Sequence, residues 1–115
     1  MGVNRTMADK KTILEQKVAI LKGIAHPVRL AVVEALADSE MCVCDIAEMF
    51  HFDRTTISKH LTLMKNLGIL EDRKEGLKVY YSLRIRCLPS MLSCIEKVVE
   101  VNDPERVFVI ECCGK

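Results

Sequence analysis

A short helix, a tight turn and a longer helix are expected in succession between Val43 and Leu67, and this constrains the fold more than any other part of the chain. The short helix covers Val43–Phe50, and residues 51–53 make the turn. Asp53 is suited to cap the free amides at the start of the longer helix, and Gly68 is suited to end it. Two helices this close in sequence predict a helix-turn-helix pair.

The longer helix has an apolar face and a polar face. Its apolar face consists of Ile57, Leu61, Met64 and Leu67. Between Arg54 and Leu67 the chain has cations but no carboxylate, so the acids that hold the net charge at +1 lie elsewhere. Hydroxyl and cationic side chains suit phosphate oxygens and base edges, although the same composition also fits a solvated face. The side chains expected to contact DNA from this helix are Arg54, Thr55, Thr56, Ser58 and Lys59.

A β-hairpin is expected after the longer helix. Ile69–Leu70 opens one strand, Val79–Leu83 forms the other, and Arg73–Lys78 is expected to turn between them. The hairpin cations Arg73, Lys74 and Lys78 are expected to contact DNA phosphates, which adds affinity and salt dependence but little sequence choice. A basic hairpin beside a basic helix is the layout of a winged helix-turn-helix.

The remaining residues predict a mostly α-helical chain with this hairpin as its wing. Further helices are expected at Lys11–Gly23, from Pro27 onward, and at Leu88–Val101. The 115 residues suit a single domain, with a core at residues 11–101 and a cysteine-bearing tail at residues 102–115. No apolar run approaches the roughly 18 to 20 residues that span a bilayer, and the N-terminus has no hydrophobic signal core. We therefore expect a cytoplasmic protein without membrane contact.

Cys42 and Cys44 stand one residue apart at the start of the short helix. Six cysteines in a chain without a secretory signal are more typical of metal or redox chemistry than of a disulfide framework. On an ideal helix the two thiols would be about 200° apart, so they can share an ion only if the first turn is extended. Asp45 and Glu48 offer a capping arrangement that would start the regular helix just after the pair. The pair predicts a site for a thiophilic ion, and two packed small side chains are the alternative.

Four motifs in the same order resemble the ArsR/SmtB family of bacterial metal-responsive repressors. They are Ile24–Leu30, Met41–Ala47, Thr56–Leu61, and the pair Gly68–Leu70 and Arg73–Gly76. The resemblance implies a homodimer built through the first and last helices, which leaves a palindromic operator on double-stranded DNA when an ion binds. It also implies As(III), Sb(III), Cd(II), Pb(II) or Zn(II) as the inducer, with As(III) or Cd(II)/Pb(II) favoured.

Two thiolates are too few for these ions, and the sequence departs from its relatives where a third ligand would be expected. The arsenite-sensing pattern has a third cysteine at the position of Ala47, and residues 1–41 contain no cysteine. Cys87 and Cys94 are expected to pack on the last helix. The missing ligand is expected from one of the other cysteines, from solvent or from a small thiol. We expect one or both of Cys112 and Cys113 of the tail to complete the site across the dimer, and a separate site formed by these two adjacent thiols is the rival hypothesis.

Two other function classes remain open from the sequence. A redox- or persulfide-sensing repressor would oxidise these cysteines on the same fold, and it would respond to oxidant in the presence of a chelator. A thiol oxidoreductase is a remote alternative, because Cys-x-Cys is not the Cys-x-x-Cys redox motif and no base accompanies it. The histidines His26 and His51 are read as structural, and for His60 packing is favoured over base contact.

Overall fold

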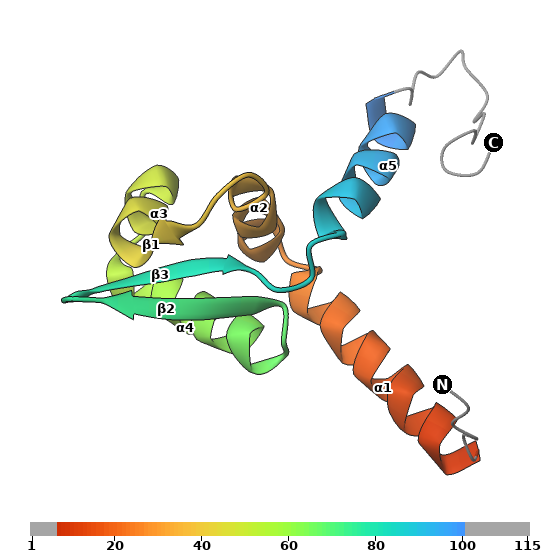
Figure 1. Ribbon diagram of the computed structural model, residues 1–115. Coiled ribbons are helices and arrows are strands. Elements are labelled where there is room, and N and C mark those ends of the chain that lie inside the picture. The colour runs from red at the N-terminus through yellow and green to blue at the C-terminus, as the bar shows by residue number, and fades with distance from the viewer. Residues whose placement is uncertain (1–6, 101–115) are drawn as a thin grey trace. The chain divides into compact units, whose positions relative to one another are not determined.

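The computed structural model describes residues 7–100 and confirms a mostly helical winged helix-turn-helix (Figure 1). Its elements are α1 (Met7–Ile24), α2 (Pro27–Ala35), β1 (Met41–Cys42), α3 (Val43–Phe50), α4 (Arg54–Asn66), β2 (Leu70–Glu75), β3 (Lys78–Leu83) and α5 (Leu88–Glu100). The elements from α1 to β3 form one compact unit, and α5 belongs to a second unit that begins at Arg86. None of the described helices is long and apolar enough to cross a membrane.

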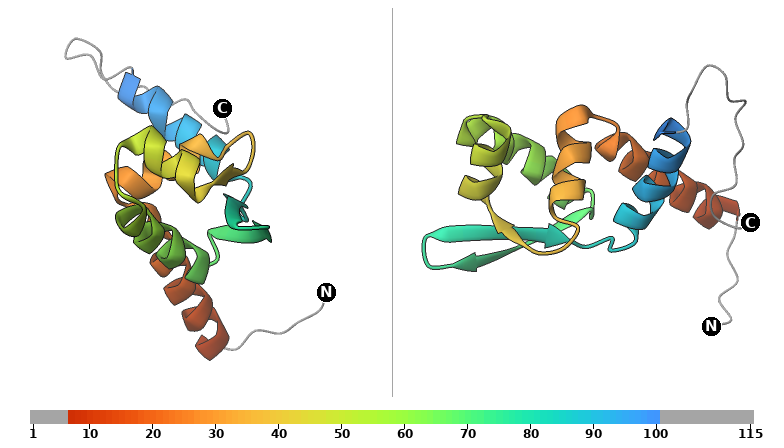
Figure 2. Two further views of the ribbon diagram at one scale, coloured as in Figure 1. Left: turned by 90° about the vertical axis from the view of Figure 1, so that its left-hand side faces the viewer. Right: turned by 90° about the horizontal axis from the view of Figure 1, so that it is seen from above.

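The sheet has three strands in the order β1-β3-β2, all antiparallel. β1 is only two residues long, and no local sequence pattern predicts it. It is defined by its pairing with Tyr80 and Tyr81 of β3. The wing turn is tighter than expected, since β2 continues to Glu75 and pairs it with Lys78. Gly76 has a φ of +64°, which a glycine adopts without strain. The tip of the hairpin projects past α3 (Figures 1 and 2).

The inner face of α4 lies at the centre of the core, as its apolar spacing predicts. Ile57, Leu61 and Met64 are fully buried, whereas Leu67 is only half-buried at the C-cap. α1 approaches the end of α4 so closely that a Cβ on Gly23 would lie 2.5 Å from the Leu67 side chain. This packing fixes which side of α4 faces outward.

The predicted bounds of α3, Val43–Phe50, are confirmed, but two other expectations about helix starts need correction. α1 begins at Met7, four residues before the expected Lys11. Because α3 begins between the two cysteines, Asp45 and Glu48 do not start it after the pair. The side chain of Cys42 itself accepts a hydrogen bond from the Asp45 N–H at 3.4 Å, so the cap that was expected from a carboxylate is a thiol.

Candidate thiol site and nucleic-acid interface

The junction between β1 and α3 brings the two thiols together. Cys42 keeps the extended backbone of β1, with φ −80° and ψ 159°, while Cys44 lies in the first turn of α3. As a result the two Sγ atoms are 2.7 Å apart. The extended first position that a shared ion requires is therefore present, and it is maintained by the pairing of Cys42 with Tyr80.

The two thiols differ in environment. Cys42 is 2% exposed, and the pKa of its thiol is raised by the contact with Cys44 and by burial. The pKa of the half-buried Cys44 thiol is lowered, chiefly by the contact with Cys42, and Arg54 contributes in the same direction. The thiol with the lowered pKa is thus Cys44, the more accessible of the two.

The donor set fits a soft ion. The Asp45 carboxylate lies with the two sulfurs in a cluster whose ligand atoms are all within 4.8 Å of one another. Thiolates prefer soft or thiophilic ions over hard ones. A tetrahedral ion with metal–sulfur bonds of about 2.3 Å would hold two sulfurs about 3.8 Å apart, so Cys42 and Cys44 are close enough to share one ion.

The other cysteines lie outside the thiol pair, and Cys94 of α5, expected only to pack, is disulfide-bonded. Cys87 is exposed and precedes α5, so the expectation that it lies on the last helix is wrong. Cys112 and Cys113, expected to complete the ion site, lie outside the described residues. The carboxylate of Asp45 is a third donor that sequence reasoning assigned only to capping. The position of Asp45 directly after Cys44 is the sequence feature that could have indicated this role.

The outward face of α4 presents a polar surface with an open groove of about 610 Å³. Its lining residues are Arg54, Thr55, Ser58, Lys59, Thr62, Leu63 and Asn66. Four of the five side chains expected to contact DNA therefore lie together. Thr56 is exposed but does not line the groove. Its side-chain hydroxyl and its backbone N–H, the latter at 3.2 Å, hydrogen-bond to the Asp53 carboxylate and lower the pKa of Asp53. Leu63 and Asn66 were not anticipated.

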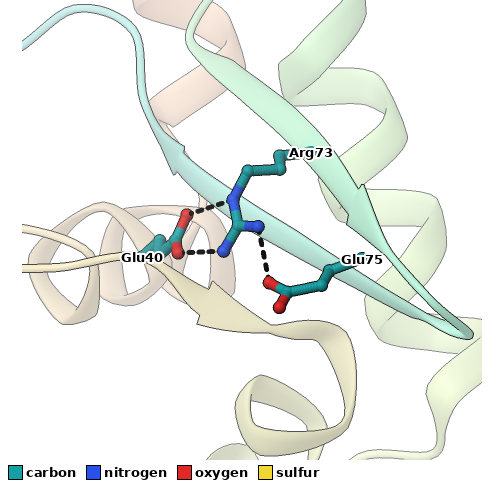
Figure 3. A network of polar contacts seen from close by, with 3 residues as sticks. All are labelled: Glu40, Arg73 and Glu75. Carbon is teal, nitrogen blue, oxygen red and sulfur yellow. Dashed lines mark hydrogen bonds and ion pairs between the residues drawn. The ribbon is translucent and has the colours of Figure 1, made fainter.

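The wing cations separate into paired and unpaired groups. Lys74 and Lys78 are exposed, as a phosphate contact requires. Arg73 instead forms ion pairs with Glu40 and with Glu75 (Figure 3). Its guanidinium also lies 4.7 Å from the centre of the Tyr80 ring. These carboxylates raise the pKa of Arg73 further above its usual range. Arg73 is therefore better explained as a link between the wing and the segment before β1 than as a phosphate contact.

His60 on α4 packs against His26, which supports the expected packing role. The two imidazole centroids are 4.8 Å apart. The Nδ1 atom of His26 accepts the Val28 N–H at 3.1 Å and so caps α2. The pKa of His60 is lowered by burial and then by His26 and Arg29. The folded protein therefore favours neutral imidazole on the inner side of α4.

Stability should fall as the pH drops, in part because of His60. Below about pH 6.5 the unfolded chain takes up the proton that the folded His60 resists, so folding weakens. The variant His60→Gln should show a shallower loss of unfolding free energy between pH 7.5 and 5.5 in urea titrations. His51→Asn is the control, because it removes an exposed histidine and keeps a residue type that tolerates the left-handed backbone at this position. An identical acid slope in wild type and His60→Gln would contradict the assignment.

Comparisons with known proteins agree on one family. The model of the family described as bacterial regulatory protein, arsR family, matches residues 26–72. A cadmium resistance transcriptional regulatory protein CadC homolog from Staphylococcus aureus is 41% identical over 83 residues, covering 70% of this chain and 69% of the relative. The transcriptional repressor SmtB from Mycobacterium tuberculosis is 32% identical over 73 residues, covering 64% of this chain but only 54% of the relative.

A solved structure supports the fold independently. It is the homodimeric winged helix-turn-helix DNA-binding domain of a possible ArsR-family transcriptional regulator from Mycobacterium bovis. The TM-score is 0.76 at 24% identity, and the match covers 93% of this chain and all of the other. At this level of identity the similarity supports the fold alone.

Proposed function

The chain belongs to the ArsR/SmtB family of winged helix-turn-helix transcriptional repressors, and from that premise we propose that a thiophilic ion bound by Cys42 and Cys44 releases it from operator DNA. The single observation that carries the proposal is the contact of the two thiols at the start of α3. α3 leads into α4 through a turn of only three residues, with His51 in the left-handed conformation. A movement at the thiols thus has a short covalent path to the DNA-contacting helix.

The coupling is mechanical in this proposal. An ion that holds the two sulfurs at its own coordination geometry must reposition Cys42, Cys44 or both. Cys42 is tied to β3 by strand pairing and is buried, so the displacement falls mainly on Cys44 and the first turn of α3. A winged helix-turn-helix dimer binds its operator when the recognition helices of both protomers fit successive major grooves. A small rotation of α4 in each protomer therefore weakens binding.

The proposed DNA contacts follow the exposed side chains. The outward residues of α4 enter the major groove, with Arg54, Thr55, Thr56, Ser58 and Lys59 as the contacting set. Lys74 and Lys78 of the wing contact phosphates beside it. Arg73 supports the position of the wing through Glu40.

The ion remains a proposal within one chemical class. Two sulfurs with an adjacent carboxylate suit As(III), Sb(III), Cd(II), Pb(II) or Zn(II). The cadmium resistance regulators among the relatives favour Cd(II) within this class. Cys112 and Cys113 stay candidates for a third ligand. Oxidation of the Cys42–Cys44 pair is the second candidate trigger, which the 2.7 Å sulfur contact favours.

Fluorescence anisotropy at fixed salt tests the function directly. The labelled DNA is the region upstream of the protein's own coding sequence, and As(III), Cd(II), Pb(II), Zn(II) and Mg(II) are titrated into the complex. Release by one or more thiophilic ions and retention with Mg(II) are the expected results. Release by peroxide with chelator present, and not by any of the ions, would favour the redox trigger.

A homodimer is proposed from two exposed apolar stripes. On α1, Leu14, Val18 and Leu21 are between 41% and 60% exposed at helical spacing. On α5, Met91, Ile95 and Val99 are between 45% and 63% exposed at intervals of four. Water-exposed stripes of this kind mark protein interfaces.

Ile95→Glu should convert the dimer to a monomer, because a carboxylate in an apolar interface has no partner. Sedimentation velocity should show the smaller species at micromolar concentration, and operator affinity should fall at least tenfold because two half-sites no longer bind together. Glu96→Gln, one residue away on α5 and outside the apolar stripe, should sediment as wild type does. A dimeric Ile95→Glu variant would remove α5 from the interface.

A further inference from the structure

A groove of about 240 Å³ lies between the thiol pair, α4 and the wing, and the proposed function above leaves it unused. All of its walls belong to the unit that runs from α1 to β3. Its lining residues are Cys42, Val43, Cys44, Arg54, Ser58, Leu77, Lys78 and Val79. One space thus faces both the candidate ion ligands and three of the candidate DNA contacts, Arg54, Ser58 and Lys78.

The cations Arg54 and Lys78 line this groove, and no carboxylate is among its lining residues. The carboxylate of Asp45 lies behind the sulfur wall, within 4.8 Å of both thiol sulfurs. Among the described residues neither cation forms an ion pair, whereas Lys65 and Arg73, the comparable cations of α4 and β2, are paired with Asp72 and Glu40. A sulfur-rich wall opposite two unpaired cations is complementary to a molecule with a soft ligand at one end and negative charge at the other.

We propose that this groove binds a small anionic thiol, whose sulfur supplies the third ligand to the ion held by Cys42 and Cys44 and whose carboxylates pair with Arg54 and Lys78. The inference rests on the proposed function and names a third sulfur ligand for that site, in addition to the nearby Asp45 carboxylate. The volume favours a small molecule, because sites for drug-sized ligands measure about 300–1,000 Å³.

Ligand exchange delivers the ion without any change of oxidation state. Trivalent arsenic arrives bonded to three thiolates, and the sulfurs of Cys42 and Cys44 replace two of them. Two As–S bonds break and two form. The protons of the two cysteine thiols leave with the departing thiolates, which are released as two free thiols. The third thiolate stays on arsenic and occupies the groove.

Occupancy of the groove would also act on DNA directly. Arg54 and Lys78 are proposed DNA contacts, and a bound dianion would occupy both cations. Release would then combine the movement of α3 with competition between the carboxylates of the thiol and the phosphates of the operator. An ion delivered by an anionic thiol should therefore release DNA more effectively than the same ion delivered by a neutral thiol.

The test uses the full chain and arsenite premixed with one of three thiols. Mercaptosuccinate carries two carboxylates, thioglycerol is neutral, and cysteamine is cationic. Binding is followed by the sulfur-to-arsenic absorption and by calorimetry, without DNA. Arsenite with mercaptosuccinate should bind wild type at least tenfold more tightly than it binds Arg54→Gln or Lys78→Gln. For arsenite with thioglycerol, the affinities of wild type and the two variants should agree within about twofold. Each comparison is made between proteins with the same thiol, so intrinsic differences between the thiols do not affect it.

Two controls complete the design. Lys22→Gln removes one exposed cation from α1 and should behave as wild type with all three thiols. Arg54→Lys keeps the charge and should restore most of the preference for mercaptosuccinate. Circular dichroism spectra of the variants confirm that the fold is retained.

Each remaining outcome has a distinct meaning. Equal affinities of wild type and the groove variants for arsenite with mercaptosuccinate would overturn the groove inference and leave the proposed function intact. A second contrary outcome is an arsenite affinity that does not depend on which thiol is supplied but falls in Cys112→Ser/Cys113→Ser. That result would identify a tail cysteine as the third ligand and would also overturn the inference. Failure of arsenite, Cd(II) and Pb(II) to bind Cys42 and Cys44 with any thiol would overturn the proposed function itself.

Discussion

Cys42→Ser/Cys44→Ser should bind operator DNA as wild type does and should not be released by any thiophilic ion. Serine replaces each sulfur by a hydroxyl of similar shape, and a hydroxyl is a poor ligand for a soft ion. The buried side chain at position 42 can still accept the Asp45 N–H, so α3 keeps its cap. In wild type the ion should lower DNA affinity about 5- to 150-fold, which corresponds to a coupling of about 1–3 kcal/mol.

Operator anisotropy with and without Cd(II) or As(III) measures this coupling in both proteins. Cys87→Ser is the matched control, because it removes an exposed thiol outside the Cys42–Cys44–Asp45 cluster. It should keep the full response. A double variant that still leaves DNA on ion addition would place the sensing site elsewhere, and one that no longer binds DNA without ion would make the thiol pair structural.

The parts of the fold that depend on local sequence could be predicted. α4 carries its own start signal in Asp53, its stop signal in Gly68, and a buried row that contains Ile57, Leu61 and Met64. Each of these acts within a few residues along the chain, so the pattern is visible without knowledge of distant partners. The wing strands were visible for the same reason, because alternation and a turn lie side by side.

The parts that depend on distant partners could not be predicted. β1 exists because residues 41 and 42 pair with Tyr81 and Tyr80, almost 40 positions further along the chain. The role of Arg73 depends on Glu40, which is 33 positions away. Periodicity and spacing contain no information about such pairs. From the sequence it follows that Cys42 and Cys44 can meet only if the backbone at the first of them is extended. The pairing of β1 with β3 shows that it is extended.

The same limit applies to the groove beside the thiols. Its walls come from α3, α4 and the hairpin, and each contributes residues with an ordinary local explanation. Lys78 is a wing cation, Arg54 is the first residue of α4, and Cys44 belongs to the thiol pair. Their convergence is a property of the tertiary structure, and it is what connects ion binding and DNA binding in one space.

Arg54→Gln and Lys59→Gln should each weaken operator binding, with different signatures. Arg54 begins α4, and the N-terminal residues of a recognition helix contact base edges, so its loss should cost about 1–3 kcal/mol and relax specificity. Lys59 is exposed one turn further along, where a phosphate contact weakens all sequences alike. Its loss should reduce the slope of log affinity against log salt by about one. Anisotropy with operator and scrambled DNA at several salt concentrations measures both effects.

Lys65→Gln/Asp72→Asn is the matched control for this experiment. It removes a cation from the same helix together with the carboxylate that it pairs with at 3.0 Å, so net charge is unchanged. Because that pair is already neutral as a unit, operator affinity and salt slope should stay close to wild type. If this double variant loses as much affinity as Lys59→Gln, ion pairing does not separate DNA contacts from other cations on α4. If Arg54→Gln and Lys59→Gln both bind as wild type does, the outward face of α4 is not the DNA interface, and the thiol pair would have to act on DNA through another surface.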